Sequence, residues 1–149
     1  MAATRTARAR WEGTLTEGRG HVTAESSGLF TQAPVSWAAR TESPDGLTSP
    51  EELLAAAHAS CYAMALSNTL AQAGTPARSL DVTGTATFAP KEGGGFHVSG
   101  MELRVEGDVP GIDQAAFEQK ARDGEAGCPI SNVIRGNVDI RLEATLTTG

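Results

Sequence analysis

SPEELLAAAHASCYAMALSNTLAQ, residues 49–72, is the stretch that decides the fold. Ser49 is a favourable N-cap, Pro50 suits the first helical position, and Glu52 is placed to complete a capping box. The alanine-rich run then continues without interruption until Gly74 ends it. We therefore predict one long helix. Because apolar residues lie on nearly every side of this helix, we expect it to be buried.

Alternating apolar and polar residues predict three β-strands before this helix and three after it. The predicted strands are residues 7–15, 21–25, 35–42, 80–88, 96–105 and 138–146. The alternation slips by one residue at Gly100, as it does at a β-bulge. Asp113 is placed to cap a second helix that ends near Arg122. The order βββ-α-ββ-α-β predicts an α+β fold with a mainly antiparallel sheet.

A single sheet can cover only one side of a helix that is apolar nearly all round. A homodimer that packs two such helices between two sheets would cover the remaining side. The sequence therefore suggests a dimer, as a hypothesis about packing.

Length and composition exclude several classes of protein. The 149 residues predict one domain, 1–149, in which about the first six residues are loosely held. The net charge is −6 and the 12 basic residues are scattered, which excludes a nucleic-acid-binding protein. No apolar run is long enough to span a membrane. No apolar segment follows the first arginines, so we expect no secretion signal and a cytoplasmic location.

The only two cysteines, Cys61 and Cys128, are predicted to lie in unlike settings. Cys61 falls in the long helix, where a cysteine is more often an inert small hydrophobic residue. His58 is the ionisable neighbour on its face, and we interpret it as a packed or capping histidine without a catalytic role. Cys128 precedes Pro129 and can be the N-cap of a short helix through about Ile134, where a thiolate is favoured. The alternative is that Cys128 merely fills a turn.

Arg40 and Glu51 are two further candidates. Glu51 remains uncommitted at the positive end of the long helix, where simple dipole complementarity is the commoner explanation for an acidic residue. Arg40 is expected on the strand face opposite Trp37, where most arginines are solvated. Glu51 precedes Cys61 by ten residues, or about 15 Å along one helix. If both residues serve one site, Glu51 is therefore expected to come from a partner subunit.

Three blocks of sequence give the chain a family resemblance. The first is TSPEELLAAAHASC at residues 48–61, which continues as AMALS at residues 63–67. The others are AGCPIS at residues 126–131 and VPGID at residues 109–113. With these blocks in this order, the chain resembles the OsmC branch of the OsmC/Ohr family of thiol-dependent hydroperoxide peroxidases.

The resemblance implies an intertwined homodimer with antiparallel sheets around long central helices. It implies that Cys61 is the peroxidatic cysteine, that Cys128 is the resolving one, and that Arg40 and Glu51 activate Cys61 and bind the peroxide. The expected substrates are organic hydroperoxides and, less well, hydrogen peroxide. The expected reductant is a dithiol or a lipoyl-bearing protein, with no metal, haem or other cofactor. Two isolated cysteines and three isolated histidines likewise match no metal-ligand spacing.

Two other functions are compatible with these residues. One is a dimeric binding module that holds an apolar ligand along the buried helix, with purely structural cysteines. The other is a thioesterase-like fold, in which Glu51 would be the key residue and Cys61 would be dispensable.

Overall fold

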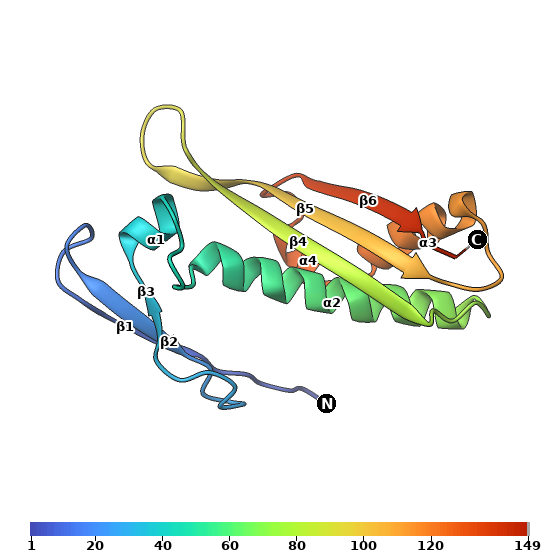
Figure 1. The fold of residues 1–149 in the computed structure, drawn as a ribbon, viewed down its shortest axis with the longest axis horizontal. Helices are drawn as coiled ribbons and strands as arrows, with labels where there is room; N and C mark the ends of the chain where they lie inside the picture. Colours follow the sequence, from blue (N-terminus) through green and yellow to red (C-terminus); the bar gives the residue numbers. More distant parts are fainter. Residues whose placement is uncertain (149) are drawn as a thin grey trace. The chain divides into compact units, whose positions relative to one another are not determined.

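The protein is described over residues 1–148 by a computed structural model, whose elements follow the order β1-β2-β3-α1-α2-β4-β5-α3-α4-β6 (Figure 1). This order confirms the predicted α+β class and adds one short helix, α1, that was not expected. The chain forms two compact units that divide after Leu53.

The first unit is a three-stranded antiparallel meander, as predicted. It consists of β1 (Arg8–Glu12), β2 (Arg19–Thr23) and β3 (Ala33–Val35), in that order across the sheet. The prediction that the first strand is half-buried is wrong for this chain, because all of β1 is exposed and Trp11 keeps 41% of its surface. A single-layered meander has no second layer of its own against which to bury a face.

The predicted strand over residues 35–42 is also wrong. β3 ends at Val35, and the chain then forms helix α1 (Trp37–Thr41). Ser36 starts this helix, since its side chain accepts a hydrogen bond from the Ala39 amide at 3.1 Å. The apparent alternation rested largely on alanine, which is a better helix former than strand former.

The second unit contains most of helix α2 (Pro50–Gln72) and a three-stranded sheet in the order β4-β5-β6. β4 (Ser79–Pro90) and β5 (Phe96–Asp108) form a long antiparallel hairpin. Two helices follow, α3 (Gln114–Ala126) and α4 (Pro129–Ile134), and β6 (Ile140–Leu146) ends the unit. The two predicted strands of the hairpin, the helix that Asp113 caps and the closing strand are thereby confirmed.

Two details of this sheet refine the prediction. The register pairs Thr87 with Gly100 and then Phe88 with Val98, which leaves Ser99 as the extra residue of a bulge, beside the predicted position. β6 pairs with β5 in parallel, so the sheet is mixed. The α3–α4 segment between them is a crossover connection, which parallel neighbours require.

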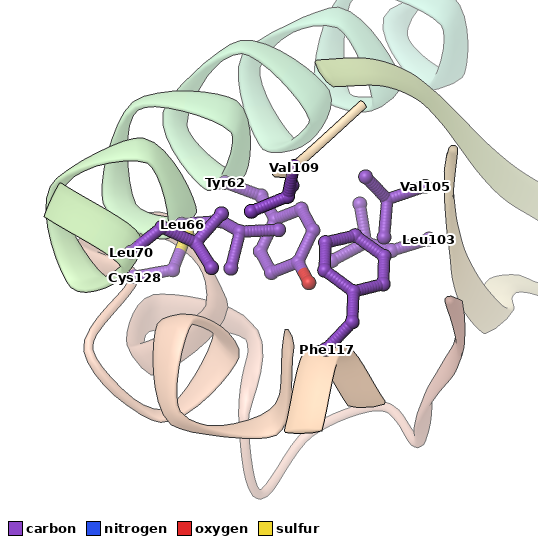
Figure 2. Close-up of a cluster of buried hydrophobic side chains, with 8 residues drawn as sticks. All are labelled: Tyr62, Leu66, Leu70, Leu103, Val105, Val109, Phe117 and Cys128. Atoms are coloured by element: carbon purple, nitrogen blue, oxygen red, sulfur yellow. The ribbon is translucent and has the colours of Figure 1, made fainter. Parts of the chain in front are cut away.

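One face of α2 packs on this sheet and on α3. Buried side chains recur at every fourth position of α2, at His58, Tyr62, Leu66 and Leu70. Figure 2 shows the hydrophobic core that the last three of these help to form. Its members are Tyr62, Leu66, Leu70, Leu103, Val105, Val109, Phe117 and Cys128.

Glycines allow the backbones in this unit to approach closely. A Cβ on Gly84 of β4 would lie 2.7 Å from the carbonyl oxygen of Ala55, and a Cβ on Gly124 of α3 would lie 3.0 Å from Leu66 Cα. The small residues therefore bring α2 into near contact with both β4 and α3.

The other face of α2 is exposed in the single chain. Its exposed residues beyond the first turn are Ala56, Ala57, Ser60, Met64, Ser67, Asn68, Ala71 and Gln72. Met64 alone keeps 69% of its surface. Helix α2 is thus covered on one side only, as expected for a single chain. Within residues 1–148, no helix combines the length and the apolar character needed to cross a membrane.

Candidate active site

Cys128 is the N-cap of helix α4, as predicted. Its backbone is extended, with φ −76° and ψ 115°, and its Sγ accepts a hydrogen bond from the Ser131 amide at 3.4 Å. Pro129 occupies the first turn, where a missing N–H costs nothing. The side chain of Cys128 is fully buried. The thiol therefore sits among the free amide groups of a helix start rather than in an ordinary turn.

Cys61 lies in the middle of α2, is half-buried, and has a free thiol, as does Cys128. Burial raises the pKa of Cys61, a hydrogen bond from the backbone of Ile130 lowers it, and a hydrogen bond with the Cys128 thiol raises it. Both groups that contact the Cys61 sulfur belong to the start of α4. The fold of the second unit thus brings together two thiols that are far apart in sequence.

His58 does not supply the positive charge that a reactive Cys61 needs. Its side chain is fully buried, and burial lowers its pKa while the charge of Glu125 raises it. The ring is therefore neutral at neutral pH. Its Nε2 lies 2.7 Å from the Oγ of Ser131, which is also fully buried. This geometry agrees with the interpretation of His58 as a packed histidine.

Arg40 and Glu51 form a bidentate ion pair in the first unit. Arg40 Nη2 donates to Glu51 Oε1 at 2.8 Å, and Arg40 Nε donates to both carboxylate oxygens at 3.1 Å. The Glu51 side chain is only 9% exposed, and the Arg40 side chain is 32% exposed. Bidentate contacts fix the plane of the guanidinium group as well as its position.

The expected orientation of Arg40 is wrong. Because residues 37–41 form a helix, Arg40 and Trp37 lie on the same face, three residues apart. The guanidinium carbon lies 6.0 Å from the centre of the Trp37 ring. The arginine is therefore held by a carboxylate and stands over an aromatic ring.

The predicted site residues thus fall into two groups. Cys61 is paired with Cys128 in the second unit, and Arg40 is paired with Glu51 in the first. Along α2, ten residues still separate Glu51 from Cys61, a rise of about 15 Å.

Sequence reasoning missed two contributors to the thiol site. They are the backbone amide of Ile130, which points to the Cys61 sulfur, and the Ser131 side chain, which pairs with His58. The sequence did offer a signal for Ser131. It follows Cys128 by three residues, which places both residues on the same side of the predicted short helix.

Comparison with known proteins identifies the family. The model of the OsmC-like protein family matches residues 43–143, which include the first-turn carboxylate of α2 and both thiols. The chain belongs to the OsmC-like protein family. The predicted resemblance is confirmed over most of the chain.

Two named relatives and one solved structure place this OsmC-like protein more closely. Peroxiredoxin OsmC of Escherichia coli K12 is 39% identical over 132 residues, covering 89% of this chain and 90% of the relative. An organic hydroperoxide resistance protein of Xanthomonas axonopodis pv. citri is 34% identical over 100 residues, covering 64% of this chain and 65% of the relative. The crystal structure of the organic hydroperoxide resistance protein OhrB of Bacillus subtilis matches with a TM-score of 0.75 at 26% identity. That match covers 94% of this chain and 98% of the other.

Proposed function

We propose that this OsmC-like protein is a thiol peroxidase that reduces organic hydroperoxides and, less well, hydrogen peroxide. The observation that carries the proposal is the contact between the Cys61 thiol and the Cys128 thiol at the start of α4. A pair of free thiols in contact can cycle between dithiol and disulfide. The names of the relatives, a peroxiredoxin and organic hydroperoxide resistance proteins, point to the same chemistry.

In the first step, the Cys61 thiolate attacks the O–O bond of the hydroperoxide. A sulfur–oxygen bond forms, the O–O bond breaks, the alkoxide leaves and takes up a proton as the alcohol, and Cys61 becomes a sulfenic acid. In the second step, Cys128 attacks this sulfur, the disulfide forms, and the oxygen leaves as water. A dithiol or a lipoyl-bearing protein then reduces the disulfide by exchange.

Cys61 needs a positive charge to form its thiolate at neutral pH, because burial and Cys128 both raise its pKa. The neutral His58 does not provide this charge. We assign the role to Arg40, which Glu51 holds in a bidentate pair with its guanidinium group oriented. The same group can donate a hydrogen bond to a peroxide oxygen.

The protein is proposed to act as a homodimer. Glu51 lies about 15 Å along α2 from Cys61 of the same chain, so the Arg40–Glu51 pair that serves Cys61 is taken to come from the partner subunit. The exposed face of α2, with Met64 at 69% exposure, supports a partner helix on that side. We expect the protein to act in the cytoplasm, in defence against oxidative or osmotic stress.

Thiol counting tests the proposal directly. The reduced protein is mixed with one equivalent of cumene hydroperoxide, denatured, and titrated for free thiols, and its mass is measured. We expect both thiols to be lost and an intramolecular disulfide between Cys61 and Cys128 to form. Cys128→Ser is the matched control, in which Cys61 is oxidised but no intramolecular disulfide forms. Two intact thiols in the wild-type protein would refute the peroxidase and leave the two alternatives, the apolar-ligand module and the thioesterase-like enzyme.

A further inference from the structure

A buried hydrogen bond joins the two helices that carry the thiols. His58 Nε2 on α2 lies 2.7 Å from Ser131 Oγ on α4, and both side chains are fully buried. His58 precedes Cys61 by three residues, and Ser131 follows Cys128 by three residues. Residues three apart share a helix face. The pair therefore lies beside the thiol contact as a second link between the same two helices.

Helix α4 depends on such links because it is very short. It has six residues, well below the length at which a helix is stable in water by itself. Its far end is held by Arg135, whose guanidinium group contacts Glu125 of α3 at 2.8 Å, with the Arg135 side chain 48% exposed and the Glu125 side chain 14% exposed. Water therefore screens this ion pair from the arginine side. The His58–Ser131 bond is, by contrast, shielded from water.

Because the His58–Ser131 hydrogen bond is buried, its loss would be costly. Among residues 1–148, His58 Nδ1 has no hydrogen-bond partner, so Ser131 is the polar contact that the ring makes. If either partner is removed, a polar atom is left buried and unpaired, which costs more than the bond itself contributes. The ring and the hydroxyl are therefore held together, and with them the relative positions of α2 and the start of α4.

The contacts of the Cys61 sulfur depend on the position of α4 relative to α2. The Ser131 amide donates to Cys128 Sγ, and the Ile130 backbone donates to the Cys61 sulfur. A small shift of α4 along α2 would weaken the Ile130 contact and move Cys128 away from Cys61, whereas the cap bond from Ser131 to Cys128 lies within the α4 segment and moves with it. We propose that His58 and Ser131 form a positioning pair, which holds Cys128 where it can attack the Cys61 sulfenic acid. This inference rests on the proposed function.

The step that the pair promotes is the condensation of the sulfenic acid with the thiol. Cys128 Sγ forms a bond to Cys61 Sγ, the sulfur–oxygen bond of Cys61 breaks, and the oxygen leaves as water with the proton of the Cys128 thiol. The Cys61 sulfur is reduced and the Cys128 sulfur is oxidised, so no further reactant is needed. Neither His58 nor Ser131 reacts, and the first step, in which the peroxide is cleaved at Cys61, depends on them only through the Ile130 contact, whereas the second step needs Cys128 in place.

The test separates the two steps in His58→Leu, Ser131→Ala and the double variant. Stopped-flow measurements with cumene hydroperoxide follow peroxide consumption in the first turnover, and quenched samples give the rate of disulfide formation by mass. We expect the first rate to stay within about twofold of wild type and the second to fall about tenfold, which corresponds to about 1.4 kcal/mol. The double variant should be no slower than either single variant, because both remove the same bond.

His58→Gln supplies the matched control, since its side-chain amide can still hydrogen-bond the Ser131 hydroxyl, and we expect it to restore most of the second rate. Excess peroxide should convert more Cys61 to sulfinic acid per turnover in His58→Leu than in His58→Gln. If His58→Leu fails to fold, Ser131→Ala, which removes a single oxygen atom, carries the same expectation.

Two results would overturn the inference. One is a wild-type rate of disulfide formation in Ser131→Ala, and the other is an equal fall in both steps, which would indicate general disruption. Failure of the proposed function has a different signature, because wild-type protein would then keep both thiols after peroxide treatment.

Discussion

The ion pair between Arg40 and Glu51, the pair proposed to activate Cys61, gives the sharpest prediction. Two unit charges about 4 Å apart attract by about 4 kcal/mol at an effective dielectric constant of about 20. Removal of water from Glu51, whose side chain is 9% exposed, offsets part of this attraction. Solvent screening at Arg40, which is 32% exposed, reduces it further. We expect a net coupling free energy of about 1–2 kcal/mol between the two side chains.

A double-mutant cycle measures this coupling. Urea unfolding at one protein concentration is compared for wild type, Arg40→Met, Glu51→Gln and the double variant. Arg10 and Glu12 provide the matched control, because they make a 2.7 Å contact in a fully solvated setting, with exposures of 67% and 62%. Their coupling should be well below that of the Arg40–Glu51 pair. Equal coupling free energies for the two pairs would refute the inference that burial strengthens the Arg40–Glu51 ion pair.

The same variants test whether the pair activates Cys61. Alkylation of Cys61 by iodoacetamide, followed over a range of pH in a Cys128→Ser background, reports the pKa of Cys61. Arg40→Met should move the midpoint to higher pH, and Glu51→Gln should move it in the same direction because the guanidinium group loses its orientation. An unchanged pH profile in Arg40→Met would remove Arg40 from the mechanism, whatever the coupling free energy.

The remaining predictions concern the thiols and the packing of the second unit. Cys61→Ser should abolish peroxide reduction, whereas Cys128→Ser should complete a first turnover and then accumulate sulfinic acid at Cys61, detectable by mass; steady turnover in Cys61→Ser would contradict the assignment. Because burial lowers the pKa of His58 from its usual 6.5, the unfolded chain binds the extra proton first. The stability that the neutral ring contributes is therefore complete above about pH 6.5 and is lost as the pH falls below it. The melting temperature of wild type should then fall more steeply below that pH than that of His58→Gln, and equally steep falls would contradict this. Gly124→Ala should cost about 1–3 kcal/mol, since its Cβ would lie 3.0 Å from the backbone of α2. The control Gly127→Ala meets nothing closer than 3.7 Å, and an equal loss in the two variants would show that close approach is not the cause.

Local signals in the sequence were sufficient for most of the elements. The N-caps at Ser49, Asp113 and Cys128 were all predicted, and each is made by a side chain that accepts a hydrogen bond from the amide three residues later. Such caps can be read from sequence because donor and acceptor lie within one turn. The strand predicted through Arg40 was wrong because a local signal was overlooked. Ser36 is the N-cap of a helix there, and a short alternation is too little to specify a strand.

By itself the sequence determined the α+β class, the long helix α2 and the two cysteines on which the proposed chemistry rests, because periodicity, capping and composition are local properties. Only the tertiary structure decided that β6 runs parallel to β5, that Ile130 and Cys128 contact the Cys61 sulfur, and that His58 pairs with Ser131. These contacts join residues far apart along the chain. The contacts of Cys61 and His58 depend on how α4 packs against α2. That packing is set by the shape of the shared core, which no local pattern in the sequence encodes.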